Sequence, residues 1–174
     1  GRLHAIWGLG QIRAADRTLP LLDDPDAEVR AQSARVLGDG RVAAAGDALV
    51  ARLKDASPRV RFHAAMGLGK LRHAQATAPL IDMIRENDDR DRLLRHAGVM
   101  ALAGIGDVDA MLAAAQGAVP SVRRAVVLAL RRMGRWEIRD FLEDREMNLE
   151  AARPRMPLTT RSSPTMPASC ASST

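Results

Sequence analysis

The chain has 174 residues, of which 47% are hydrophobic, 27% charged and 2% aromatic, and its formal net charge is +5. This length is enough for one ordinary domain. No run of about 20 apolar residues is present, so no transmembrane helix is expected. The single cysteine, Cys170, excludes an internal disulfide and a Cys-x-x-Cys-His haem attachment motif within this chain.

The first residues, Arg2 to Gly10, contain a phrase that the chain then repeats: an arginine seven residues before a leucine or its equivalent, in a run of small residues. The arginines stand at positions 2, 30, 61, 95 and 123, so the steps are 28, 31, 34 and 28 residues. The repeat arginines are Arg2, Arg30, Arg61, Arg95 and Arg123. Periods of this length predict one supersecondary unit stacked on its own copies.

Each period holds two helical patterns in chain order. The first, as in residues 18–22 and 76–84, ends at an acidic corner with turn and N-cap residues, such as residues 23–26. The second helix then spaces its apolar or small residues with a period of 3.6, as at Val29, Ser33, Val36 and Leu37. Gly-rich stretches at 38–40 and 104–106, and Gly134, predict helix ends that contain a residue with a positive φ. No stretch alternates with period two, so an all-α fold is expected.

The predicted architecture is an α-α superhelix, right-handed and of about five helix pairs, over residues 1–153. Because the array opens on a second helix and stops inside a repeat, we expect a fragment of a larger protein. Residues 154–174 contain four prolines and no acidic residue, which predicts a disordered tail. Two interpretations of the tail stay open: an out-of-frame or truncated reading, or a natural Ser/Pro-rich linker.

The pattern of an Asp-Pro corner, Val-Arg, a small residue and Leu-Gly resembles HEAT repeats of the short bacterial type, from residue 2 to about 152. Residues 2–10, 24–30, 86–91 and 95–103 more narrowly resemble the HEAT segment of large bacterial haem-binding membrane proteins. In that family a propeller precedes the repeats and a cytochrome c domain follows. This resemblance implies a periplasmic or membrane-associated location. No residue here matches the family's redox motifs, so no cofactor is expected.

The resemblance also implies a role for the repeat arginines. In HEAT repeats the corresponding arginine pairs with a corner acid and holds neighbouring repeats in register. We therefore predict structural ion pairs at these five positions. As partly exposed pairs, they would each contribute about 0–1 kcal/mol.

In HEAT solenoids the second helices line the concave face, so outward positions on these helices are candidate partner-binding residues. They lie two and six residues after the residue that anchors each helix to the core. The apolar members are Leu3, Trp7, Phe62, Met66, Met100 and Leu128, and the others are Ala31, Arg35, His96 and Arg124. Exposed apolar rows mark binding surfaces. The alternative is that these side chains pack laterally against the next repeat.

Other constellations do not predict a site. His4 and His63 occupy equivalent positions two repeats apart, too far to share a metal ion. The corner at 87–91 lacks the glycine and distal glutamate of a calcium loop, and Asp91 is expected to cap a helix. An arginine cluster at 123–139 could meet phosphate, but acids are interleaved with it, and a solvated helix face is the favoured interpretation.

The sequence thus favours a non-catalytic scaffold that binds a protein or an adjacent domain on its concave face. Two alternatives remain. One is part of an enzyme: either the accessory section of a haem-dependent dehydrogenase or a bilin-lyase-like HEAT protein. The other is a DNA-binding HEAT module.

Overall fold

The computed structural model describes residues 1–141, and all of their regular structure is helical. The expected all-α solenoid is therefore confirmed. The predicted boundary at residue 153, the tail and Cys170 lie outside the described residues. Within residues 1–141, none of the helices is both long and apolar enough to cross a bilayer.

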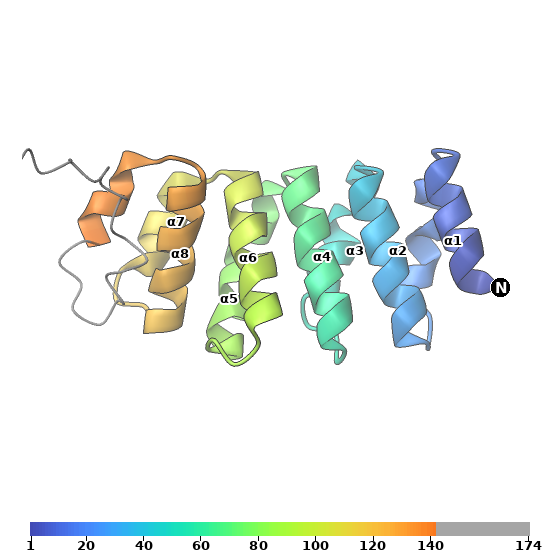
Figure 1. The fold of residues 1–174 in the computed structure, drawn as a ribbon, viewed down its shortest axis with the longest axis horizontal. Helices are drawn as coiled ribbons and strands as arrows, with labels where there is room; N and C mark the ends of the chain where they lie inside the picture. Colours follow the sequence, from blue (N-terminus) through green and yellow to red (C-terminus); the bar gives the residue numbers. More distant parts are fainter. Residues whose placement is uncertain (142–174) are drawn as a thin grey trace, which may run out of the picture.

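The helices form two rows, which Figure 1 shows one behind the other. The front row consists of the second helices: α1 (Arg2–Gln11), α2 (Ala27–Asp39), α4 (Pro58–Leu71), α6 (Arg92–Ile105) and α8 (Pro120–Arg132). The rear row consists of the first helices: η1 (Ala15–Asp23), η2 (Ala43–Ala45) with α3 (Gly46–Arg52), η3 (Ala74–Ala76) with α5 (Thr77–Asn87), and α7 (Val108–Ala115). A last 3-10 segment, η4 (Trp136–Phe141), follows α8. The described residues thus contain four complete pairs, preceded by α1 and followed by η4.

The sequence accounts for where most helices begin. Asp26 accepts a hydrogen bond from the Glu28 N–H and caps α2, while Asp107 accepts from the Ala110 N–H and caps α7. The expected cap at Asp91 is present, since its carboxylate accepts from the N–H groups of Leu93 and Leu94. These side chains satisfy donors that have no partner inside the helix.

Two local expectations need correction. The first helix of the first pair, η1, is a 3-10 helix, because Pro20 lies inside it and removes a backbone donor that an α-helix needs. The stretch 38–40 was expected to contain a residue with a positive φ, but Gly40 has a φ of −74° and the positive value of 50° falls on Arg41. Gly40 is instead required for space, since a Cβ there would lie 2.8 Å from the Cβ of Ala15. Gly106 and Gly134 have positive φ as predicted.

Glycines let the front-row helices touch backbone to backbone. A Cβ added to Gly38 of α2 would lie 2.5 Å from the Cα of Gly67 on α4. On the other side of α4, a Cβ at Gly69 would lie 2.7 Å from the Cα of Ala101, and one at Gly104 would lie 2.6 Å from the Gly69 carbonyl oxygen. No side chain fits at these positions, so α2, α4 and α6 form the tightest part of the array.

The core runs between the two rows. One continuous cluster of buried side chains extends from Leu22 to Phe141, and a smaller cluster of Ile6, Ala15, Val29 and Val36 lies at the α1 end. Each pair buries its apolar sides against its own partner and against its neighbours, as expected for stacked repeats.

Candidate partner-binding face

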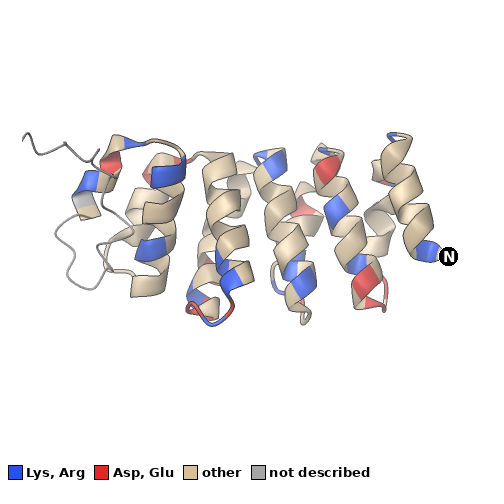
Figure 2. Cartoon of the chain, in the orientation of Figure 1, with Lys and Arg blue, Asp and Glu red and all other residues tan. Residues whose placement is uncertain are grey.

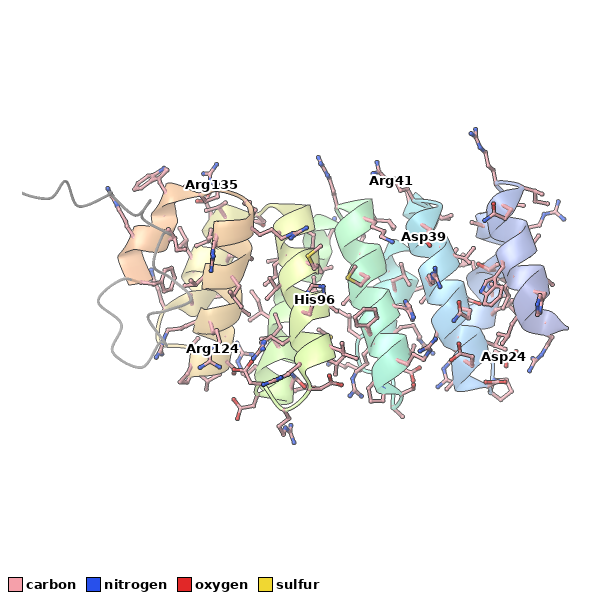
Figure 3. The ribbon with its side chains drawn as sticks, viewed as in Figure 1. Asp24, Asp39, Arg41, His96, Arg124 and Arg135 are labelled. Carbon is pink, nitrogen blue, oxygen red and sulfur yellow. The ribbon has the colours of Figure 1, made fainter. Side chains whose placement is uncertain are left out.

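We call the outward side of the front row the second-helix face; it is carried by α1, α2, α4, α6 and α8. In Figure 2 the charged segments of α4, α6 and α8 lie toward the helix ends, and their central turns carry neither sign. Figure 3 shows charged side chains at both ends of the helices: Asp24 and Arg124 lie at the lower ends, and Arg41 and Arg135 at the upper ends. On α4, α6 and α8 the middle of this face is therefore its least charged part, whereas α2 carries the exposed Arg35.

The predicted site residues differ in how far they are exposed. Trp7 is 43% exposed and is the most accessible of the six. Phe62, Met66 and Leu128 are half-buried and pack against the main core, and Leu3 packs against the small cluster at the α1 end. Met100 is also half-buried. Lateral packing, the alternative interpretation, thus accounts for part of the surface of these side chains.

The other four outward positions also differ from one another in exposure. Arg35, His96 and Arg124 are accessible, but Ala31 is fully buried. Ala31 belongs to α2, which packs against α1 on one side and α4 on the other. A one-carbon side chain does not reach past these neighbours, so α2 contributes no apolar anchor to the face.

A hydrogen-bonded chain links three of the second helices on this face. The Trp7 indole N–H donates to Gln32 Oε1 at 2.9 Å, and Gln32 Nε2 donates to Glu28 Oε1 at 2.7 Å. Arg59 on α4 completes the chain, with its Nε 2.8 Å from Glu28 Oε2. Gln32, Glu28 and Arg59 were not among the residues predicted for this face. The sequence signal for Gln32 is its place between the small residues Ala31 and Ser33, in a stretch of α2 that is buried against neighbouring helices.

A second polar bridge lies nearer the other end of the same helices. Lys70 on α4 forms an ion pair with Asp39 on α2, and Asp39 also faces Arg35 at 3.7 Å. Both bridges hold α2 against α4 while leaving charged groups accessible.

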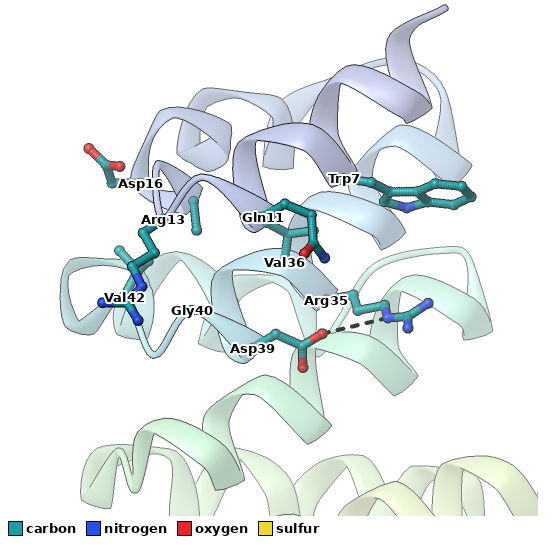
Figure 4. Close-up of a pocket in the computed structure, with 11 residues that line it drawn as sticks. Trp7, Gln11, Arg13, Asp16, Arg35, Val36, Asp39, Gly40 and Val42 are labelled. Carbon is teal, nitrogen blue, oxygen red and sulfur yellow. Dashed lines mark ion pairs between the residues drawn. The ribbon is translucent and has the colours of Figure 1, made fainter.

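A cleft of about 860 Å³ opens between α1 and α2 (Figure 4). Figure 4 shows Trp7 at one end of the cleft and Asp16 with Arg13 toward the other. Arg35 and Asp39 line it from α2. The cleft combines a large aromatic side chain with charges of both signs, which suits a peptide segment better than a small apolar ligand.

His63 lies at the centre of the face. Its ring packs edge-on against Phe62, with 5.1 Å between the centroids. Burial lowers the pKa of His63 below its ordinary value, and the positive charges of Arg59 and Arg35 lower it further. This histidine is therefore neutral at pH 7 and adds no charge to the middle of the face.

The repeat arginines contact the corners between the helices, though not identically. Arg2 binds Asp24 of the following corner at 2.7 Å, and Arg30 binds Asp55 of the following corner through two bonds of 2.9 Å each. Arg95 binds Asp89 of its own corner at 3.2 Å. Arg61 and Arg123 donate to main-chain carbonyls of their own corners, including those of Asp55 and Ala118 respectively. The stabilising role of these contacts remains a prediction.

Asp55→Asn tests that role. The side chain of Asp55 is 5% exposed. Burial alone would raise the pKa of Asp55, but hydrogen bonds from Arg30 and the Ser57 N–H, with the charges of Arg30 and Arg52, hold it below the ordinary value of 3.8. Asp55→Asn should lower the free energy of unfolding by about 2 kcal/mol near neutral pH, because a charged hydrogen bond is lost.

The pH dependence follows from the direction of this shift. Since the folded pKa is the lower one, the pair stabilises the chain fully above the unfolded pKa and stops doing so as the pH falls through the folded pKa. Urea denaturation of both proteins from neutral to strongly acidic pH should show their difference disappearing in acid. A difference that persists unchanged at acidic pH would mean that the amide perturbs packing and not an ion pair.

The arginine cluster of α8 and η4 makes internal contacts. Arg124 forms an ion pair with Asp89, and Arg135 binds Glu137 at 2.6 Å. The guanidinium of Arg139 lies 4.1 Å from the centroid of the Trp136 ring, which could otherwise stack on a base. This arrangement favours the interpretation of a solvated helix surface over a nucleic-acid site.

Among residues 1–141, no three histidine, cysteine, aspartate or glutamate side chains come together as metal ligands. His4 is exposed near Trp7, and His73 lies 3.2 Å from Asp47 between neighbouring pairs. The corner at 87–91 forms a cap and a set of ion pairs, as described above.

Stacked helix pairs with a shared core and an accessible row of second helices define an α-solenoid of the kind that binds other proteins. A sequence model of HEAT repeats matches residues 15–103, which is more than half of the chain. The protein belongs to the HEAT-repeat family. Members of this family generally mediate protein interactions and are typically not enzymes. A comparison with curated proteins found no match for this chain.

Proposed function

We propose that this chain is a non-catalytic scaffold that binds a protein, or a neighbouring domain, on the second-helix face. The observation that carries the proposal is the exposed Trp7 at the mouth of the 860 Å³ cleft between α1 and α2. Tryptophan is enriched among residues that dominate binding energy. An indole that is fixed by its bond to Gln32 loses little conformational freedom when a partner covers it.

The remaining apolar residues extend this surface along the array. Phe62 and Met66 on α4, Met100 on α6 and Leu128 on α8 each keep part of their side chain accessible. Methionine adapts to different partner shapes, because its side chain is flexible and polarizable. A partner that reaches from the cleft toward α8 would thus meet helices α4, α6 and α8, whose middle turns are uncharged and whose ends carry charges.

The proposal predicts a specific loss of binding. Trp7→Ser and the double variant Phe62→Ser, Met66→Ser should each weaken capture of the natural partner by about tenfold or more, because large apolar anchors dominate interfaces. The measurement is quantitative capture on the immobilised chain, with circular dichroism to confirm that helicity is kept. Trp136→Ser is the matched control, since Trp136 is 60% exposed but lies on η4.

Charge reversal at Arg131 and Arg132 provides the opposite test and should change binding little. If that reversal abolishes capture while the serine variants bind like the parent, the interface is electrostatic and lies elsewhere. If the double serine variant unfolds the array, Phe62 and Met66 act in lateral packing, and Trp7→Ser alone decides the proposal.

The narrower resemblance to haem-binding membrane proteins rests on the sequence segments alone. The bilin-lyase-like and DNA-binding alternatives likewise gain no support from the contacts of residues 1–141. An absorbance spectrum of the purified chain tests for haem or bilin, and a salt-dependent DNA mobility shift tests the third alternative.

A further inference from the structure

A ladder of arginine and aspartate connects the starts of α1, α2 and α4. Arg2 and Arg30 each reach a carboxylate in the corner that follows them, Asp24 and Asp55 respectively. Both aspartates have the same local geometry, since each also accepts the N–H of the residue two positions later at 2.9 Å. The ladder position is thus a carboxylate held at the base of the next second helix.

The third step of this ladder is missing. By repeat position Arg61 should reach the corner before α6, but it donates instead to the carbonyls of Asp55 and Ala56 in its own corner. Arg30 makes the same kind of carbonyl contact in addition to its carboxylate pair. Arg61 forms no ion pair with any residue between 1 and 141.

The corner before α6 explains the difference. Asn87 closes this corner: its Oδ1 accepts the Asp91 N–H at 3.1 Å and its Nδ2 donates to the Asp91 carbonyl at 2.9 Å. Asp89 has a positive φ of 58° and pairs with Arg95 and Arg124. A neutral amide therefore lines the place that Arg61 faces, and the nearby carboxylate is used by other arginines.

A cleft of about 510 Å³ lies at this position, between the ends of α3 and α5 and the beginnings of α4 and α6. Three cations line it, Lys54, Arg61 and Arg90, together with the carboxylates of Glu86 and Asp91. Asp91 is engaged in capping α6, and Arg90 donates to the carbonyls of Glu86 and Asn87. Lys54 forms no ion pair within the described part of the chain. The cleft lining thus has three cationic side chains and two carboxylates, so positive charge is in excess.

We propose that this cleft binds a carboxylate side chain of an acidic protein segment, which takes the place that Asp24 and Asp55 occupy in the neighbouring repeats. Arg61 supplies a planar guanidinium suited to two parallel hydrogen bonds with a carboxylate. Lys54 adds a second, flexible positive charge. The site lies at the corner end of the helices and is separate from the second-helix face, so it does not depend on the proposed function above.

The test is a titration of the isotope-labelled full chain with a short capped polyglutamate peptide, followed by NMR. Backbone amides around Lys54 and Arg61 should shift, and a polyglutamine peptide of equal length should cause no shift there. Arg61→Gln should weaken the polyglutamate complex about tenfold, as expected for loss of a charged hydrogen bond. Lys54→Gln should weaken it about threefold, as expected for a partly solvated charge.

Arg92→Gln is the matched control, because Arg92 is an exposed arginine in the first turn of α6 outside the cleft lining. This variant removes the same charge at the same end of the molecule and should bind like the parent. Equal weakening by Arg92→Gln, equal binding of polyglutamine, or no binding at millimolar peptide would overturn the proposal. Efficient displacement of the peptide by inorganic phosphate would also overturn it, since the cleft would then be a general anion site.

Folding does not confound this result. Arg61 also holds its own corner, so Arg61→Gln could loosen α4. Lys54 forms no ion pair that its loss would break, and Lys54→Gln should keep the parental melting temperature. If Arg61→Gln unfolds the chain, Lys54→Gln is the deciding variant. A parental affinity of Lys54→Gln for the polyglutamate peptide would contradict the proposed site.

Discussion

Gly38→Ala is expected to destabilise the protein by about 3 kcal/mol, at the upper end of the usual cost of overpacking. The added Cβ would lie 2.5 Å from the Cα of Gly67, and this contact is with backbone, which cannot rotate away as a side chain can. Helices α2 and α4 would have to separate. Their separation would also weaken the contacts of Arg59 with Glu28 and of Lys70 with Asp39.

Gly8→Ala is the control for this prediction. Gly8 lies in α1 and has no neighbouring atom within 4 Å of an added Cβ. The same chemical change should stabilise the protein here by about 0.5–1 kcal/mol, because alanine is the better helix former. Urea denaturation of the two variants should therefore give shifts of opposite sign. Shifts of the same sign would show that α2 and α4 do not touch through their glycines.

Leu68→Ala and Leu102→Ala are expected to cost about 2–5 kcal/mol each, the range found for large-to-small changes in a core. Leu68 is 0% and Leu102 is 1% exposed, and both lie on second helices with a neighbouring repeat on each side. The cavity cannot collapse easily where the flanking helices are already in backbone contact.

Leu9→Ala should cost less than either, since Leu9 is half-buried on α1. Comparing the three free energies of unfolding by denaturant titration tests whether stability is distributed as in a nearest-neighbour stack. Equal losses at the three positions would show that the described neighbours do not set the local stability. Amide hydrogen exchange should rank the same helices in the same order.

The candidate site was predicted in part. The repeat pattern identified the second helices and their outward positions, because a period of 3.6 residues places Trp7, Phe62 and Met66 on the side away from the core. Relative exposure was not predictable from that pattern. Phe62 and Met66 are half-buried while Trp7 is more exposed, and this depends on how far neighbouring helices approach.

Local sequence signals were sufficient for the helical class, the repeat unit and the cap at Asp91, since each of these depends on residues within a few positions of one another. The partners of the repeat arginines depended on tertiary structure. Arg30 and Arg61 occupy the same place in the repeat, yet Arg30 finds Asp55 and Arg61 does not find a carboxylate in the next corner. The cause is the way the corner before α6 folds: Asn87 makes the closing bonds and Asp89 pairs with Arg124. Contacts between repeats depend on helix offset and on how each corner folds, and a motif that is periodic in sequence does not specify either of them.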